Sequence, residues 1–185
     1  TLWHTLSLHD ALPIWNNFKW TAFKGQLVCD KKDNAINYKR YLDNIGIVSS
    51  EVLISPPDDR EGEESAFGKP SDRVKSFWNK MMDEHGTPAK YQKNLINRFV
   101  NKDHPELIIV VDKLLTGFDA PRNTVLYITR KLQEHTLLQA IARVNRMFPD
   151  KDYGYIIDYY GVLGALDEAL TIYSSFEEFD EADLA

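Results

Sequence analysis

The segment 107–111 (LIIVV) is made of branched aliphatic residues, and this feature constrains the fold more than any other. A strand that is apolar at every position must be covered on both faces, as in a parallel sheet. Similar short strands alternate with amphipathic helices along the chain. The predicted strands are 24–29, 51–54, 107–111, 124–128 and 153–159, and the predicted helices are 32–44, 72–85, 88–100 and 134–147. This alternation predicts an α/β fold, an open parallel sheet with helices on both faces and right-handed crossovers.

Single residues predict where several of these helices begin and end. Ser71 and Thr87 are predicted N-caps, because a hydroxyl oxygen can accept a hydrogen bond from the first helical turn. Pro88 suits the first helical position, where its missing N–H is not needed. Gly46 and Gly86 are expected to end the helices that precede them.

The chain of 185 residues has the length of one domain. The predicted domain is 15–161, and a helical linker with an acidic tail follows over 162–185. Residues 1–14 resemble translated sequencing-adapter sequence, so we expect them to be a non-native lead-in. A short native helix broken at Pro13 is the alternative.

The formal net charge of −6 has the wrong sign for a chain coated in nucleic acid. The acidic residues are concentrated in the loop 58–64 and the tail 177–183, however, and the remaining body is nearly balanced. The single cysteine, Cys29, excludes an intrachain disulfide framework and fits the reducing cytoplasm, which is the expected location. No apolar stretch approaches the ~20 residues of a membrane span, and the five histidines lack metal-ligand spacing. We therefore expect no membrane partner and no metal held by this chain.

Two segments near the carboxyl end carry the predicted chemistry. Residues 114–121 read LLTGFDAP, and residues 139–146 read QAIARVNR on a predicted helix. At about 100° per residue, Gln139, Arg143 and Arg146 fall on the face opposite the apolar stripe of this helix. Arginine offers a permanently charged, planar fork that fits phosphate oxygens. The helix therefore predicts a triphosphate or phosphodiester site across a cleft, with a solvated basic surface as the alternative.

The expected position of this chemistry follows from the fold class. Ligands of open α/β sheets gather beyond the carboxyl ends of the strands. The segments 112–119 and 158–161 both follow predicted strands, so we expect the candidate groups to cluster along one edge of the sheet. Asp158 could support this cleft or simply end its strand.

The spacing Gln139-x-x-x-Arg143-x-x-Arg146 resembles motif VI in the second RecA-like lobe of superfamily-2 helicases and translocases, and the segment 116–119 resembles motif V. With LLTGFDAP and the later segment 154–161 (GYIIDYYG), the chain most closely resembles the R subunit of type I restriction enzymes over roughly residues 24–175. The resemblance implies the RecA-like, C-terminal lobe of a motor that hydrolyses ATP and translocates duplex DNA, within an endonuclease.

The same resemblance implies roles for individual residues. Arg146 and Arg143 would reach the γ-phosphate of ATP bound by the first lobe, where an arginine finger stabilises the charge of phosphoryl transfer. Gln139 would help to orient the nucleotide. Gly117 would let the backbone approach the ligand closely, and Asp119 would accept from a ribose hydroxyl or lock its loop. A plain turn is the alternative reading of this loop.

The family grips the DNA backbone with loops of both lobes, which implies nucleic-acid contacts in this chain. The candidates are Lys31, Lys32, Lys113 and Thr116, which follow or lie near predicted strand ends. Each lysine that neutralises a phosphate adds salt-sensitive affinity without reading sequence. Ordinary surface lysines are the alternative, and Thr116 stands where many relatives place an arginine.

Several parts of such an enzyme have no counterpart in the sequence. The segment 62–70 is too widely spaced for a phosphate-binding loop and has proline in place of the magnesium-binding hydroxyl. No acidic box and no nuclease motif is evident. The chain by itself is therefore expected to be inactive. ATP and Mg²⁺ would be cofactors of the parent protein, with Mg²⁺ held by the missing first lobe.

The implied partners are duplex DNA, the first lobe and nuclease domain of the same parent chain, and the methyltransferase and specificity subunits of a restriction complex. Two alternatives remain open. One is the C-terminal lobe of another superfamily-2 DNA or RNA helicase, and the other is a non-catalytic α/β binding module.

Overall fold

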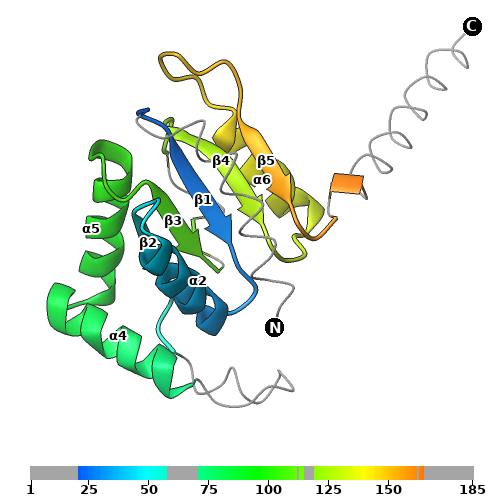
Figure 1. Ribbon diagram of the computed structural model, residues 1–185. Helices are drawn as coiled ribbons and strands as arrows, with labels where there is room; N and C mark the ends of the chain where they lie inside the picture. Colours follow the sequence, from blue (N-terminus) through cyan, green and yellow to red (C-terminus); the bar gives the residue numbers. More distant parts are fainter. Residues whose placement is uncertain (1–20, 58–70, 112, 115–118, 162, 165–185) are drawn as a thin grey trace, which may run out of the picture.

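The computed structural model describes residues 21–57, 71–111, 113–114, 119–161 and 163–164. Within these ranges, five parallel strands form one sheet in the order β2-β3-β1-β4-β5 (Figure 1). In chain order the elements are β1 (Lys24–Val28), α2 (Lys32–Ile45), β2 (Ser50–Leu53), α4 (Asp72–His85), α5 (Pro88–Asn101), β3 (Leu107–Val110), β4 (Asn123–Ile128), α6 (Glu134–Val144) and β5 (Tyr155–Asp158). The predicted α/β fold with a parallel sheet is confirmed.

Strand β1 is buried along its whole length because helices cover the sheet on both sides. Its alternate side chains point to opposite faces. On one face Val28 packs in a core with Phe99 of α5 and Leu137 of α6. On the other face Leu27 packs in a second core with Leu42 of α2. In Figure 1, α2 lies in front of the sheet and α6 lies behind it. Strand β3 is also buried at every position, as the LIIVV segment predicted, and so is β4.

The predicted helix caps are confirmed. The Ser71 hydroxyl accepts from the backbone N–H of α4 at Val74, at 3.3 Å, and the Thr87 hydroxyl accepts in the same way from α5, at 3.2 Å. Gly46 ends α2 with φ of 69°, a left-handed conformation that a residue with a Cβ adopts only at a cost. Local hydrogen bonding thus sets these boundaries.

Helix α6 ends at Val144, three residues before the predicted end at Met147. Here tertiary contacts override the periodicity. The Asn145 side chain accepts a hydrogen bond from the backbone N–H of Gly154, at 2.9 Å, so the chain turns out of the helix towards β5. The two segments lie so close that a Cβ added at Gly154 would lie 2.6 Å from the carbonyl carbon of Val144.

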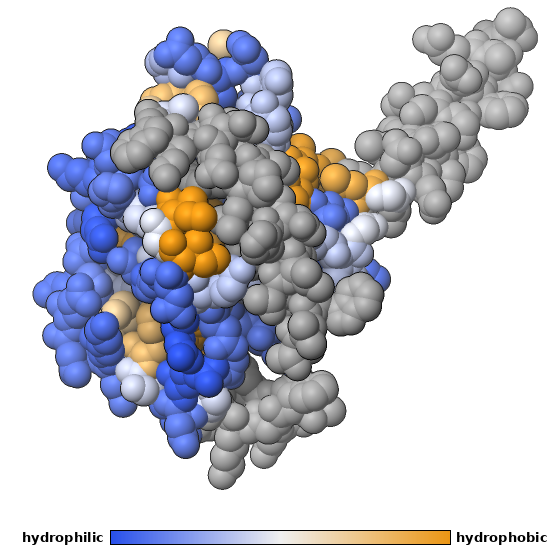
Figure 2. Space-filling view, in the orientation of Figure 1, coloured by the Kyte–Doolittle hydropathy of each residue, from blue (hydrophilic) through white to orange (hydrophobic). Residues whose placement is uncertain are grey.

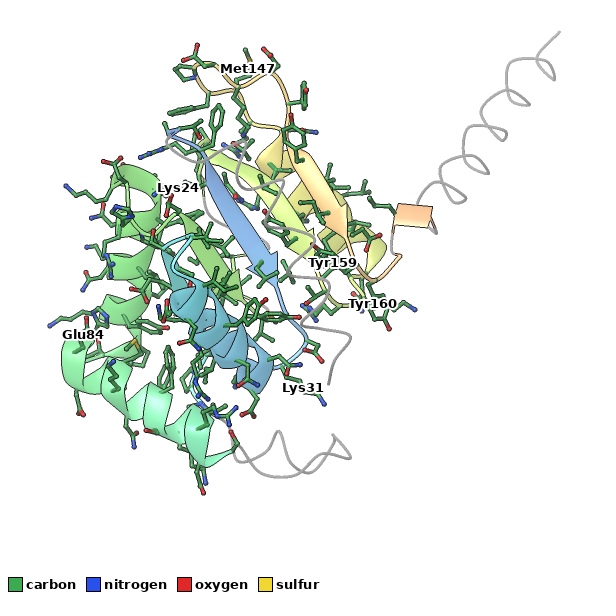
Figure 3. The ribbon with its side chains drawn as sticks, viewed as in Figure 1. Lys24, Lys31, Glu84, Met147, Tyr159 and Tyr160 are labelled. Carbon is green, nitrogen blue, oxygen red and sulfur yellow. The ribbon has the colours of Figure 1, made fainter. Side chains whose placement is uncertain are left out.

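Parallel strands give the sheet two distinct ends, an amino end where the strands begin and a carboxyl end where they finish. Figure 3 shows Lys24 and Met147 at the amino end, and Lys31, Tyr159 and Tyr160 at the carboxyl end. Helix α6 runs from the carboxyl end of β4 back to the amino end of β5, so the residues that follow it lie at the amino end.

The surface over α2, α4 and α5 is largely hydrophilic (Figure 2). The exposed large hydrophobic residues of the described part are Leu138, Met147, Tyr153, Tyr155 and Tyr160. Among the helices that the structure describes, none is both long enough and apolar enough to cross a membrane.

Candidate functional site

An ion pair joins the two segments that the sequence singled out. Nη1 of Arg146 lies 2.7 Å from Oδ1 of Asp119. Arg146 follows the end of α6 by two residues, and Asp119 lies on the return segment between β3 and β4. Both side chains are about half exposed, at 49% for Arg146 and 62% for Asp119. The pair is therefore open to a ligand arriving from outside the domain.

Arg143 belongs to the same cluster. Partial burial lowers the pKa of its guanidinium, the neighbouring Arg146 lowers the pKa further, and Asp119 opposes both effects. A guanidinium stays protonated in proteins, so the cluster holds two positive charges and one negative charge. Such an arrangement attracts an anion, and phosphate fits the guanidinium fork.

Of the remaining predicted ligand residues, the structure describes only Gln139. Gln139 is exposed on α6, four residues before Arg143, which puts both on one helix face. Gly117 and Thr116 lie outside the described residues, so their predicted roles stay predictions. The structure brings together Asp119, Arg143 and Arg146.

The expectation that all candidate groups share one edge of the sheet is wrong. Asp119 and Arg146 lie at the amino end, whereas Asp158 lies at the carboxyl end as the last residue of β5. The cause is the parallel topology. The segment after β3 must return along the sheet to begin β4 at Asn123, and it carries Asp119 to the opposite end.

A groove of about 610 Å³ lies next to Asp119. Its wall is one face of α5, where Ile96 and Val100 lie among the polar residues Gln92, Lys93, Asn97 and Asn101. The groove beside Asp119 is thus lined by both apolar and polar side chains of α5.

The predicted nucleic-acid lysines take part in contacts within the chain. Nζ of Lys32 donates to the carbonyl of Pro56, at 2.9 Å, and Nζ of Lys113 donates to Oε1 of Gln92, at 2.6 Å. Lys31 is exposed and lies at the carboxyl end of the sheet (Figure 3). Lys31 and Lys32 follow the end of β1, away from Arg146.

Asp158 acts as a cap for the chain that follows β5. Its Oδ1 accepts from the backbone N–H groups of Tyr160 and Gly161, both at 2.9 Å, and its Oδ2 accepts from that of Leu163, at 2.8 Å. These bonds account for the carboxylate without a ligand.

Sequence reasoning missed the buried polar groups behind the ion pair. Lys151 is 8% exposed, and Gln26 and Asn123 are 2% and 1% exposed. Gln26 and Lys151 bond to the backbone on either side of Asp119, and the Asn123 side chain donates to Gln26. The polar residues Lys24 and Gln26 within the predicted buried strand 24–29 were the signal that could have revealed a buried polar network here. No cluster of His, Cys, Asp or Glu suited to a metal occurs in the described ranges.

Comparison with known sequences gives a consistent family. The sequence model of type I restriction enzyme subunit R domain 3 matches residues 21–161. The chain is 34% identical over 172 residues to the "Putative type I restriction enzyme MjaVIIP endonuclease subunit" of Methanocaldococcus jannaschii. The matched region covers 88% of this chain and 15% of that protein. It is 38% identical over 98 residues to the type I restriction enzyme HindI endonuclease subunit of Haemophilus influenzae, covering 51% of this chain and 9% of that protein.

Solved structures show the same fold. A fragment of "a putative HsdR subunit of a type I restriction enzyme" from Vibrio vulnificus has a TM-score of 0.54 at 18% identity, covering 84% of this chain and 26% of that chain. The C-terminal domain of the DEAD-box protein Dbp5 has a TM-score of 0.55 at 13% identity, covering 91% of this chain and 77% of that domain. The sheet is therefore that of a RecA-like helicase C-terminal lobe.

Proposed function

Because the chain belongs to the family of type I restriction enzyme subunit R domain 3, we propose that it is the second motor lobe of an ATP-dependent DNA translocase within a restriction endonuclease. The chain spans about 15% of the length of its M. jannaschii relative, so the activity of the whole protein belongs to the proposal. The observation that carries it is the cluster of Arg146, Arg143 and Asp119.

The cluster fits a nucleotide phosphate in charge and in exposure. Two guanidinium groups outnumber one carboxylate, and the Arg146 side chain is half exposed at the domain surface. In the proposed mechanism Arg146, with Arg143 beside it, reaches the γ-phosphate of ATP held by the first lobe. Mg²⁺, which the first lobe would also hold, would supply further charge neutralisation at the phosphates. An arginine finger in this position typically accelerates phosphoryl transfer by ~10³–10⁵.

Asp119 has an orienting role in this proposal. Its carboxylate holds the Arg146 guanidinium through one oxygen, which limits the directions that the fork can take. Its other oxygen can accept from a ribose hydroxyl. Gln139, on the face of α6 that carries Arg143, would help to orient the nucleotide. Gly117 would allow the backbone to approach the nucleotide closely.

Movement along DNA would follow from closing and reopening of the two lobes around ATP. In this lobe Lys31, Lys32, Lys113 and Thr116 would contribute to the DNA track. The parent protein would cut DNA with a separate nuclease domain and assemble with methyltransferase and specificity subunits. This chain alone would not hydrolyse ATP.

The test is ATP hydrolysis by a full-length R subunit that carries this lobe, with and without duplex DNA. Arg146→Ala should reduce DNA-stimulated hydrolysis by ~10³ or more while ATP still binds, because only charge stabilisation in the transition state is lost. Arg98→Ala is the matched control. Arg98 is 43% exposed and pairs with Glu51 at 3.4 Å, but it is not among the α5 residues that line the groove beside Asp119.

Hydrolysis that is unchanged in Arg146→Ala would remove the arginine-finger role. The non-catalytic binding module would then be the better description of the chain. An equal loss in Arg98→Ala would point to general destabilisation of the lobe.

A further inference from the structure

The return segment that carries Asp119 is tied to the sheet by buried polar side chains at both of its ends. Near its start, Nε2 of Gln26 donates to the carbonyl of Leu114, at 3.2 Å. Near its end, Nδ2 of Asn123 donates to Oε1 of the same Gln26, at 3.1 Å. Gln26 projects from the middle of β1 between α5 and α6, so it joins the two ends beneath the segment.

Lys151 extends this chain of bonds to the segment that carries Arg146. Its Nζ donates to the carbonyls of Pro121 and Asn123, each at 2.8 Å. These carbonyls lie two and four residues beyond Asp119. The backbone N–H of Lys151 donates to the carbonyl of Phe148, at 3.0 Å, and closes the turn that begins two residues after Arg146. One residue therefore holds the backbone on both sides of the ion pair.

Burying the Lys151 ammonium group has a desolvation cost, which its two bonds to backbone carbonyls offset. The side chain is 8% exposed, and it is satisfied by backbone carbonyls rather than by a carboxylate. Burial lowers the pKa of Lys151 to about 8. An apolar side chain of similar length would avoid this cost of desolvation, but it could not hold two carbonyls in place.

We propose that Lys151 is a positioning residue for the Asp119–Arg146 pair. Its ammonium group fixes the backbone at Pro121 and Asn123, and its own backbone fixes the turn after Arg146. The separation of the two segments is thereby set by one residue. The proposal rests on the proposed function for its catalytic consequence, because a misplaced arginine fork would miss the transferring phosphate.

Lys24 supplies a matched comparison within the same sheet. It is 1% exposed, and its Nζ donates to three carbonyls, those of Lys102, Asp103 and Pro105, each at 2.6 Å. Burial lowers its pKa to about 8 as well. It differs from Lys151 in what it holds, because its carbonyls belong to the connection between α5 and β3. Lys24→Met therefore controls for the general effect of removing a buried ammonium group.

The experiment compares Lys151→Met and Lys24→Met in a full-length R subunit, with and without Arg146→Ala. Lys151→Met should lower kcat of DNA-stimulated ATP hydrolysis by roughly 10- to 100-fold, since small misplacements of a catalytic group have effects of this size. KM for ATP should change by less than about twofold, because binding of the ground state is retained. Lys24→Met should leave kcat close to that of the wild type.

The double variant separates positioning from stability. If Lys151 acts through Arg146, Lys151→Met should lower kcat by less than about twofold once Arg146 is alanine. Hydrogen–deuterium exchange gives a readout that needs no activity. Exchange over residues 119–124 should be faster in Lys151→Met than in Lys24→Met.

The proposal is overturned if exchange over residues 119–124 is the same in both lysine variants. It is also overturned if the effect of Lys151→Met on kcat persists in full in the Arg146→Ala background. If Arg146→Ala by itself leaves kcat unchanged, the proposed function fails, and the exchange measurement alone then decides whether Lys151 positions the segment.

Discussion

The two ends of the sheet use charged side chains in different ways. At the carboxyl end, Lys32 bonds to a carbonyl of its own chain and Asp158 accepts from three backbone N–H groups. At the amino end, Arg146 and Asp119 form an exposed pair, and the buried Lys151 supports the backbone behind it. Lys32 and Asp158 at the first end hold the fold, whereas the Arg146–Asp119 pair at the second end remains open to a partner.

This difference departs from the usual position of ligands beyond the carboxyl ends of strands. That rule describes sheets that hold their ligand with their own strand-end loops. In the proposed motor the phosphates are held by the first lobe, and this lobe only presents side chains to them across a cleft. A site that acts in trans needs exposed arginines on a rigid support, and it need not lie at the carboxyl end.

The largest expected effect on stability tests the close contact at the amino end. Gly154→Ala should lower the free energy of unfolding by roughly 2–3 kcal/mol, because the new Cβ would meet the carbonyl group of Val144, which is backbone and cannot move aside cheaply. Gly164→Ala is the control, since a Cβ there meets nothing within 4 Å. Urea unfolding of both variants gives the comparison. Equal stabilities would show that α6 and β5 can separate freely.

The two buried lysines make the amino end sensitive to pH. Burial lowers the pKa of Lys24 and of Lys151 from 10.5 to about 8. Between these values the unfolded chain binds more protons than the folded one, so both lysines make stability rise with pH. Buried tyrosines and Cys29 act in the opposite direction, because burial raises their pKa values.

The contribution of one lysine therefore has to be measured as the difference in unfolding free energy between the wild type and a variant that lacks it. Between pH 8 and 9.5, the unfolding free energy of the wild type should rise relative to that of Lys24→Met, by about 1 kcal/mol. Urea titrations at four or five pH values would show this. A difference that stays constant with pH would mean that the three carbonyls keep the ammonium group charged in the fold.

Alanine substitutions of one aspartate at each end of the sheet compare the two ends directly. Asp158→Ala should destabilise the chain by about 1–2 kcal/mol, since three backbone N–H groups lose their acceptor. Asp119→Ala should change stability by less than about 0.5 kcal/mol, because it loses only an exposed ion pair. Thermal unfolding measures both stability changes. ATP hydrolysis in the full-length subunit should fall more in Asp119→Ala than in Asp158→Ala. A large loss of stability in Asp119→Ala would make that pair a structural contact.

The smallest expected effect concerns the lysines at the carboxyl end. If Lys113 contacts a phosphate, Lys113→Ala should reduce the slope of log affinity for duplex DNA against log salt by about 1, with little dependence on DNA sequence. Lys90→Ala on the exposed side of α5 is a suitable control. An unchanged slope in Lys113→Ala would leave its bond to Gln92 as the role of Lys113.

Most of the architecture could be predicted because its signals are local. The caps at Ser71 and Thr87 and the left-handed stop at Gly46 depend on neighbouring residues alone, and each lies where it was predicted. Strand burial followed from hydrophobicity at consecutive positions of β3. The end of α6 could not be predicted in this way, because Asn145 leaves the helix to bond Gly154, nine residues away.

The sequence by itself determined the parallel α/β class and placed Gln139 and Arg143 on one helix face, since helical periodicity is a property of the chain alone. The prediction that Arg146 shares this helix face was wrong, because α6 ends at Val144. Only the tertiary structure decided that Arg146 meets Asp119 at the amino end of the sheet. It also decided that Lys151, Asn123 and Gln26 support the segment that carries Asp119. The physical reason is that these contacts depend on how the segment after β3 returns across the sheet. The path of that segment is set by strand order and by buried hydrogen bonds between residues far apart in the chain.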